Sequence, residues 1–382
     1  MARRGRVGVV AAIATLALAG CASRAARPSA VATTSPTPAP ATASAATPAP
    51  SLPIPAGFQP VALSAISEND FWVLGRSPCA TVLGCPTEIL HTVDGGATFE
   101  RITAPATICL TGAPPGGGPP TVRDLRFANA LDGWVFGDGP AWSTHDGGEH
   151  WAELDFNWTF LQIEPGANGW VYATVQICSN PADTSTCTDF VMRSPAHDEE
   201  WSQLAIPDNP AGRPVIGVHG DTVWVMYFGR STGLAWTSHD DGRIWQHASM
   251  ACEPDLGGTF DPVSTTVIWA FCATGTQGGP ALSTNGGATY ALKNGPPNDF
   301  WNGATVAAQS AQKAFVGAGN SAIQVTTNGG LTYQTLPQFP TALWIGFTDS
   351  AVGYVITEDD ITLTSRLWRT TDGGSVWKLV TL

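Results

Sequence analysis

Short apolar runs recur along this chain, each three or four residues long and carrying at least one aromatic ring. They are Phe71–Leu74, Gly133–Phe136, Gly169–Tyr172, Val223–Met226, Ile268–Phe271, Ala314–Val316 and Gly353–Ile356. Their β-branched and aromatic residues, in short runs bounded by turn formers, predict buried strands. A looser strand is predicted before each run, as at Val122–Phe127 and Thr341–Phe347. Apolar spacing of helical period is absent, so the pattern predicts an all-β protein.

A second pattern, eight residues long, follows six of these runs. It reads hydroxyl residue, any residue, Asp or Asn, Gly or Asp, Gly, two variable residues and an aromatic. The copies are Thr92–Phe99, Thr144–Trp151, Ser238–Trp245, Ser283–Tyr290, Thr326–Tyr333 and Thr370–Trp377, and Ser194–Trp201 keeps only the two ends. Successive copies are 43 to 52 residues apart. Such a period indicates a ring or stack of similar units.

Each unit is expected to contain four antiparallel strands, with the eight-residue box between the third and the fourth. In the last unit the fourth strand is predicted at Trp377–Leu382. Seven such units predict a seven-bladed β-propeller of four-stranded antiparallel blades.

The box itself reads as a tight turn. Glycine accepts a positive φ, and an Asp or Asn side chain can bond the backbone of its own turn. We therefore expect a structural role for the third residue of each box: Asp94, Asp146, Asp240, Asn285, Asn328 and Asp372.

This box resembles the Asp-box, or BNR repeat, of sialidases, sortilin-type receptors and the photosystem II stability/assembly factor family. The unit GWVFGDGPAWSTHDGGEHW at 133–151 is most similar to that last family. The resemblance covers roughly residues 57–382. It implies a propeller whose boxes lie on peripheral hairpins, and a role in binding or assisting the assembly of other proteins.

The N-terminal end reads as an export signal. Three arginines precede an apolar stretch that ends in Leu18-Ala19-Gly20-Cys21. A basic start and a short apolar region are typical of a signal peptide, here residues 1–20. The ending resembles the lipobox of bacterial lipoproteins, which implies lipidation of Cys21; a plain signal peptide is the alternative. Residues 21–56 are mostly Ala, Pro, Ser and Thr and predict a disordered tether before a propeller at 57–382.

Charge narrows the range of partners. Charged residues make up only 13% of the chain. After position 55 there are 13 basic and 31 acidic residues, a net charge of −18 for the propeller. Nucleic acid and anionic lipid headgroups are poor partners for such a body. We expect a monomer, held at the membrane only by its lipid.

The cysteines are expected to form disulfides, because an exported protein can keep them. We predict the pairs Cys79–Cys85, Cys178–Cys187 and Cys252–Cys272, with Cys109 left over and able to compete with the first pair. In a four-stranded blade, all seven positions map to the face opposite the boxes. Zinc is disfavoured because no C-x-x-C pair or His cluster accompanies them, and neither a metal nor a cofactor is expected.

The same face carries the longest variable segments, at Ser77–Glu88, Ala104–Pro120, Ile177–Thr188 and Asn294–Asn302. Long loops on a rigid scaffold commonly carry recognition. Trp158, Phe300 and Trp301 are candidate ligand-binding aromatics, although each could instead pack between blades.

Catalysis has little support in the sequence. The chain lacks the Phe-Arg-Ile-Pro segment of sialidases, recurring arginines, a Ser-His-Asp elbow and a phosphate loop. A glycosidase needs two facing carboxylates. Candidates expected on the loop face are Asp155, Glu164, Asp208, Asp255, Asp261 and Asp299, but nothing in the sequence pairs any two of them. No catalytic residue is assigned.

These observations predict an exported, lipid-anchored, non-catalytic binding or assembly scaffold at the cell envelope. Its partner is expected to be a protein or an envelope glycan. A glycan-binding lectin, or a glycoside hydrolase of the Asp-box class, is the alternative.

Overall fold

The computed structural model describes residues 53–77, 87–105, 122–137, 139–180, 184–208, 212–228, 233–253, 257–272, 279–295, 305–318, 321–359, 362 and 364–382. Among these residues no helix is both long and apolar enough to cross a membrane. The predicted signal peptide and Cys21 lie outside the described residues, as does the tether up to residue 52.

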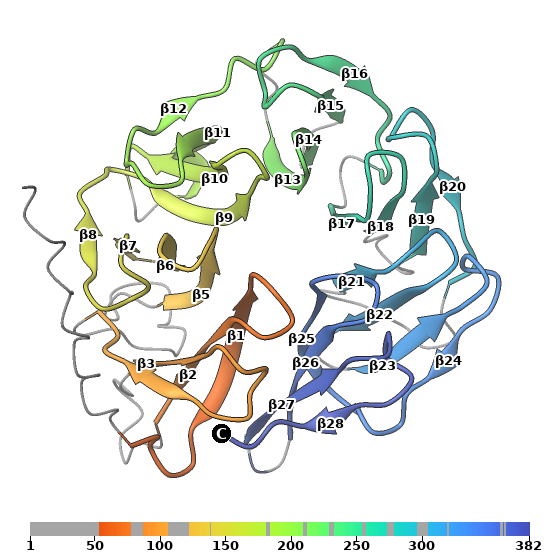
Figure 1. Cartoon of the computed structure of the whole chain (residues 1–382). Coiled ribbons are helices and arrows are strands. Elements are labelled where there is room, and N and C mark those ends of the chain that lie inside the picture. The colour runs from red at the N-terminus through yellow and green to blue at the C-terminus, as the bar shows by residue number, and fades with distance from the viewer. Residues whose placement is uncertain are drawn as a thin grey trace, which may run out of the picture. The chain divides into compact units, whose positions relative to one another are not determined.

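The described residues form seven four-stranded antiparallel sheets, each from consecutive strands, so the predicted seven-bladed propeller is confirmed (Figure 1). Blades one to three are β1 (Gln59–Ala65), β2 (Phe71–Arg76), β3 (Thr87–Thr92), β4 (Glu100–Ile102); β5 (Val122–Phe127), β6 (Gly133–Gly137), β7 (Ala141–Thr144), β8 (Ala152–Leu154); and β9 (Thr159–Pro165), β10 (Trp170–Cys178), β11 (Cys187–Pro195), β12 (Ser202–Gln203), with the 3-10 turn η1 (Thr184–Thr186) between β10 and β11. Blades four and five are β13 (Arg213–His219), β14 (Thr222–Phe228), β15 (Leu234–Ser238), β16 (Gln246–Ala248); and β17 (Gly258–Pro262), β18 (Ile268–Cys272), β19 (Gly279–Ser283), β20 (Ala291–Leu292). Blades six and seven are β21 (Thr305–Ala308), β22 (Ala314–Ala318), β23 (Ser321–Thr326), β24 (Gln334–Thr335); and β25 (Ala342–Phe347), β26 (Gly353–Glu358), β27 (Ser365–Thr370), β28 (Lys378–Leu379).

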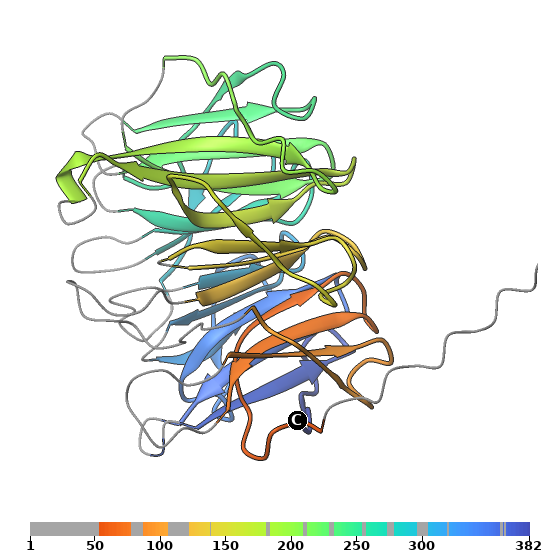
Figure 2. The same ribbon diagram turned by 90° about the vertical axis from the view of Figure 1, so that its left-hand side faces the viewer.

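The first strand of each blade lies innermost, around a central axis, and the short fourth strand lies at the rim (Figure 1). The turn between the first two strands and the box between the last two emerge on one side, here called the box face. The β10–β11 hairpin, with η1 at its end, emerges on the opposite side, and reaches farther there than the other described strands (Figure 2). We call this second side the disulfide face.

One aromatic ring per blade is buried at the same place in the second strand. In all seven cases it is at most 1% exposed: Trp72, Trp134, Tyr172, Trp224, Trp269, Phe315 and Tyr354. In the third blade, whose apolar run carries two rings, the buried one is Tyr172. Trp170 is half-buried instead, and the Arg193 guanidinium lies 4.4 Å from its ring centroid.

These rings join each blade to the next. The Trp224 indole N–H donates to the Gly286 carbonyl of the following blade at 2.9 Å, and the Trp269 indole N–H donates to the Ser310 carbonyl at 2.8 Å. At Gly374, whose φ is +85°, a Cβ atom would lie 2.5 Å from the Phe315 ring of the preceding blade. Close packing between blades therefore requires glycine in this box.

Ring closure depends on packing between the first and last blades. β1 pairs with β2 and β28 pairs with β27, so among the described strands none is shared across the closure. The Tyr354 hydroxyl and an Arg369 guanidinium N–H instead donate to the Glu68 carbonyl, at 3.4 and 2.6 Å. A mixed apolar cluster that includes Leu63 and Ile356 fills the seam.

Candidate functional site

The six complete boxes share one hydrogen-bond network. In each, the hydroxyl of the first residue accepts from the amide of the fifth, with distances of 2.8 to 3.0 Å. The Oδ1 atom of the third residue accepts from the amide of the seventh at 2.8 to 3.0 Å. The third residues so engaged are Asp94, Asp146, Asp240, Asn285, Asn328 and Asp372. Each side chain thus bonds the backbone of its own turn.

Each box is also tied to the first turn of its blade. The amide of the fourth box residue donates to a carbonyl there, as in Gly95 to Asn69 at 2.9 Å and Gly373 to Ala351 at 2.7 Å. The eroded third-blade copy keeps such a bond, but from its third residue, Ala196, to Gly169 at 2.8 Å. These contacts place the box side chains at the rim of the box face, away from the channel.

The aspartate boxes should make the fold sensitive to acid. Hydrogen bonds from Thr98 and then Thr92 hold the pKa of Asp94 near 2, and backbone amides lower the pKa values of Asp240 and Asp372. A lowered folded-state pKa contributes stability above the unfolded value, and that stability is lost as pH falls through the folded pKa. Asn285 and Asn328 make the same backbone bonds, and each side-chain amide donates to a threonine hydroxyl. Because an amide does not titrate, the bonds of these two boxes do not depend on pH. The triple variant Asp94→Asn, Asp240→Asn, Asp372→Asn should therefore lose less stability between pH 4 and pH 2 than the parent.

Urea unfolding midpoints at pH 6 and at pH 2.5 measure this difference. The expected result is a similar midpoint for both proteins at pH 6 and a smaller acid-induced drop for the triple variant. A midpoint that falls at pH 6 would mean that the amide cannot replace the carboxylate in these turns. An equal drop in both proteins would show that other groups set the acid sensitivity.

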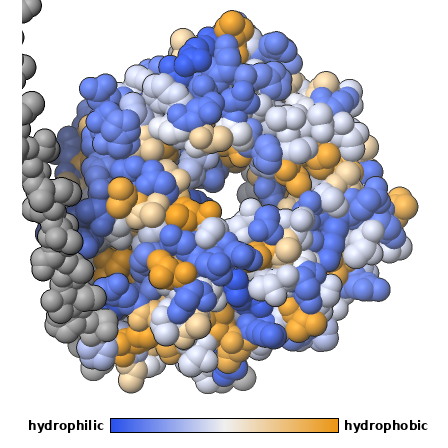
Figure 3. Space-filling view, in the orientation of Figure 1, coloured by the Kyte–Doolittle hydropathy of each residue, from blue (hydrophilic) through white to orange (hydrophobic). Residues whose placement is uncertain are grey.

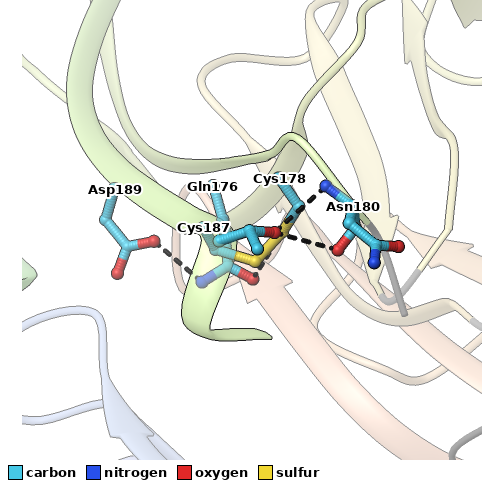
Figure 4. Close-up of a disulfide and its surroundings, with 6 residues drawn as sticks. Gln176, Cys178, Asn180, Cys187 and Asp189 are labelled. Atoms are coloured by element: carbon cyan, nitrogen blue, oxygen red, sulfur yellow. Dashed lines mark hydrogen bonds between the residues drawn. A yellow bond between two sulfur atoms is a disulfide. The ribbon is translucent and has the colours of Figure 1, made fainter. Parts of the chain in front are cut away.

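On the disulfide face, Cys178 and Cys187 stand opposite each other at the ends of β10 and β11 and are bonded, as predicted (Figure 4). The Gln176 amide donates to Asp189 across the same two strands at 2.8 Å. Beyond the bridge, Thr186 exchanges hydrogen bonds with the backbone of Asn180 at 3.0 and 3.1 Å. These contacts tie together the described ends of β10 and β11 on both sides of the bridge.

The predicted Cys252–Cys272 bridge is also present. Both residues are buried, 8% and 3% exposed. Cys252 lies in the connection after blade four and Cys272 ends β18, so this bridge joins two neighbouring blades. Cys79, Cys85 and Cys109 lie outside the described residues, and their pairing stays a prediction.

A groove of about 510 Å³ runs beside the third-blade hairpin on the disulfide face. Its lining combines aromatic, cationic and amide side chains from blades two, three and four: Arg123, Phe156, Asn157, Trp158, Gln176 and Arg213. The Trp158 ring stacks on Phe156 with centroids 4.3 Å apart, and both rings pack on the core between blades two and three. Trp158 therefore packs between blades and also forms a wall of the groove. Phe300 and Trp301, the other two candidates, lie outside the described residues.

The box-face end of the central channel holds a second cavity, of about 330 Å³, and Figure 3 shows the opening on this face. In each blade one inner-strand residue pairs directly with the buried aromatic ring of β2 or its equivalent. We call these seven residues the channel ring: Ser64, Arg126, Glu164, Gly217, Asp261, Ala307 and Gly346. All except Gly217 line the cavity.

Two residues of the channel ring lie on the opposite side of the propeller from the one predicted from the sequence. Glu164 and Asp261 were expected on the loop face, but both lie near the box-face ends of their strands. The reason is strand direction: the first strand of every blade runs from the disulfide face to the turn on the box face, and both residues come late in it. Asp155 and Asp208 are exposed, and Asp255 and Asp299 lie outside the described residues.

Charges in the channel are only partly paired. Arg126 donates to Asp124 at 2.9 Å, with side chains 19% and 29% exposed. Glu164 accepts from the Gln162 amide at 3.1 Å, and Asp261 accepts from the Ala308 backbone amide at 2.7 Å. Burial raises the pKa values of Asp124 and Glu164, against the opposing effect of Arg126, and raises the pKa of Asp261 to about 6.

Comparison with known proteins identifies the fold of this chain but assigns the chain to no family. No family model and no curated protein matches the chain. Among solved structures, YCF48 bound to D1 peptide has a TM-score of 0.55 at 16% identity, covering 84% of this chain and 96% of its own. YCF48 from Cyanidioschyzon merolae has the same TM-score at 15% identity, covering 85% and 99%. A Mycobacterium tuberculosis puromycin-hydrolyzing peptidase also reaches 0.55 at 11% identity, with 86% of this chain matching 55% of that one. At these identities the likeness shows the propeller fold alone.

Proposed function

We propose that this chain is an exported, lipid-anchored, non-catalytic propeller that binds a segment of a partner protein in the groove of its disulfide face. The observation that carries the proposal is the composition of that groove: a stacked aromatic pair beside two exposed arginines, next to a disulfide-bonded hairpin. Rigid aromatic anchors and arginines dominate the energetics of protein recognition.

The charge of the groove suggests the nature of the partner. Arg123 and Arg213 are exposed at the starts of β5 and β13. They lie on a propeller that carries a net charge of −18 after position 55. A local cationic site on an acidic body favours a segment with acidic residues or a free carboxyl group, and like charge repels acidic segments elsewhere.

Two further observations agree with this role. A propeller of the same fold, YCF48, has been solved bound to a D1 peptide, so the fold supports peptide binding. The predicted lipid on Cys21 and the tether up to residue 56 would hold the propeller at the outer side of the membrane. Metabolic labelling with palmitate tests that anchor.

The groove proposal predicts a position-dependent loss of binding. A photocrosslinking amino acid at position 213 should trap one recurrent protein on intact cells, and the same probe at position 243 should not. Once that partner is identified, Trp158→Ala should weaken its binding about 30-fold, as expected for loss of a central aromatic contact worth about 2 kcal/mol. Arg213→Glu should have a similar effect through charge reversal.

Arg243→Glu is the matched control, because this substitution makes the same charge change on the box face, at a side chain that is 59% exposed. It should leave affinity within about twofold, as expected for a charge remote from the interface. Equal trapping at both positions, or equal loss in both charge reversals, would contradict the groove. A glycan-array signal that Trp158→Ala abolishes, without any protein crosslink, would replace the protein partner by a glycan.

A further inference from the structure

One charge in the channel ring, that of Asp261, is not needed for the hydrogen bonds that join neighbouring blades. Side chains of the inner strands bridge neighbouring blades: Ser64 accepts from the Phe127 amide at 2.8 Å, and Asp261 accepts from the Ala308 amide at 2.7 Å. Ser64 makes this bridge with a neutral hydroxyl. The negative charge of Asp261 is therefore not needed for the bridge, and placing it there costs desolvation energy.

A second carboxylate faces the same cavity. Glu164, from β9, raises the pKa of Asp261 by its negative charge, after the larger effect of burial. Arg126 is held by Asp124 at 2.9 Å. Among the described residues neither Glu164 nor Asp261 has an ion-pair partner within 4 Å. Arg126 offsets part of the charge of Glu164 but is also paired with Asp124, so Asp124, Glu164 and Asp261 together outnumber this one cation. Carboxylates in excess over cations in a poorly hydrated site attract a further cation from solution.

The rest of the cavity wall is mainly uncharged. Blades six and seven contribute Ala307 and Gly346, which lie beside apolar and aromatic residues of the same cavity. The Trp344 indole lies over Gly346, where a Cβ would be 2.4 Å from the ring, and it lines the cavity. An aromatic face is a favourable wall for a cation.

The dimensions favour an organic cation over a bare metal ion. Among the described residues, only Asp146, Glu149 and His150 place three potential metal-ligating atoms within 4.8 Å of one another, and they lie in a box. The channel cavity of about 330 Å³ is within the usual range for small organic ligands.

We propose that the box-face end of the axial channel binds a primary alkylammonium group, held between Glu164 and Asp261 against the Trp344 ring. The ammonium donates hydrogen bonds to the two carboxylates, and its alkyl part lies along the apolar wall. This site is independent of the groove, because it opens on the opposite face.

Binding should depend on pH through Asp261. The charged groups that face Asp261 across the channel are Glu164 and, beyond it, Arg126 and Asp124. Strand β17 packs against β13, β18 and β21. Neither β18 nor β21 carries a titrating side chain, and β13 carries only Arg213 and His219, at its two ends. Because burial raises the pKa of Asp261 to about 6, the carboxylate is ionised at pH 7 and mostly protonated at pH 5.

Calorimetric titration of the full-length chain in detergent with n-propylammonium chloride tests this site, with sodium propionate as the anionic counterpart. At pH 7 we expect one propylammonium per chain and no propionate binding. At pH 5 binding should be about tenfold weaker, the protonation factor one unit below the pKa. Asp261→Asn should weaken binding about tenfold at pH 7 and reduce the pH dependence to the contribution of Glu164, since only the charge of Asp261 is removed. Glu153→Gln, an equal charge change on the exposed strand β8, should leave affinity within about twofold.

Loss of folding can be separated from loss of binding. The amide introduced by Asp261→Asn keeps an oxygen for the Ala308 backbone N–H and removes a desolvated charge, so the urea midpoint at pH 7 should rise. The proposal is overturned if propylammonium gives no stoichiometric binding at pH 7, if Asp261→Asn binds as tightly as the parent, or if propionate binds equally well.

Discussion

Replacing Trp224 with alanine is expected to lower the free energy of unfolding by about 3 to 5 kcal/mol, the usual cost of removing a large buried aromatic side chain. Trp224 is 1% exposed and packs in a cluster that spans blades four and five, together with Phe260 and Ile268. Its indole N–H also donates to Gly286 in the box of the next blade. The cavity would therefore loosen two blades, and urea or thermal unfolding measures the loss.

Two phenylalanine variants separate packing from the hydrogen bond. Trp224→Phe keeps most of the ring but leaves the partly buried Gly286 carbonyl without its indole donor. Trp72→Phe makes the same volume change, but among the described residues the buried Trp72 indole N–H has no acceptor. We expect Trp224→Phe to cost about 1 kcal/mol more than Trp72→Phe, the net worth of one hydrogen bond. Equal costs would mean that the bond between blades contributes nothing measurable, and a small effect of Trp224→Ala would contradict the inter-blade role.

The number of blades could be predicted from the sequence because two local signals coincide in six of the seven units. A run with a buried ring is followed by a turn whose chemistry is local: in Thr92–Phe99 the hydroxyl and the aspartate bond backbone atoms within the same eight residues. Such signals need no knowledge of distant contacts. The two described disulfides could be predicted for a related reason, since Cys178 and Cys187 flank one hairpin loop.

The third blade shows what happens when one signal erodes. Its box lacks the Asp and both glycines, and the bond to the first turn comes from Ala196, one position earlier than in the other blades. Its run contains both Trp170 and Tyr172. Only the strand pairing, Tyr172 with Glu164, decides which ring occupies the core.

The channel ring could not be predicted, because its charged members are far apart in sequence. Arg126, Glu164 and Asp261 come from blades two, three and five and meet only when the ring closes. A usable signal was nevertheless present: the register places Arg126, Glu164 and Asp261 each eight positions before the buried ring of its blade. Residues at that offset line the channel, whatever their chemistry. Glu164 and Asp261 were candidates on composition alone, without this register.

Removal of the Cys252–Cys272 bridge is expected to be the other large loss of stability. The bridge closes a loop with a sequence separation of 20 residues. Opening a loop of that length frees the unfolded chain and costs about 3 kcal/mol in the chain-entropy model. Both cysteines belong to the apolar cluster between blades four and five, so alanine at both positions also loses some packing. The double variant Cys252→Ala, Cys272→Ala should therefore unfold at a clearly lower urea concentration than the parent under oxidising conditions.

The second bridge serves as the control, because it constrains a different level of structure. Cys178 and Cys187 already face each other in a β-ladder of nine residue pairs. Their replacement by alanine should therefore fray the hairpin end, with faster amide exchange in 176–189, more than it lowers the global midpoint. The two double variants should therefore differ. Loss of Cys252–Cys272 should lower the stability of the propeller, whereas loss of Cys178–Cys187 should loosen the wall of the groove and weaken partner binding. Equal global destabilisation by the two double variants would contradict this division.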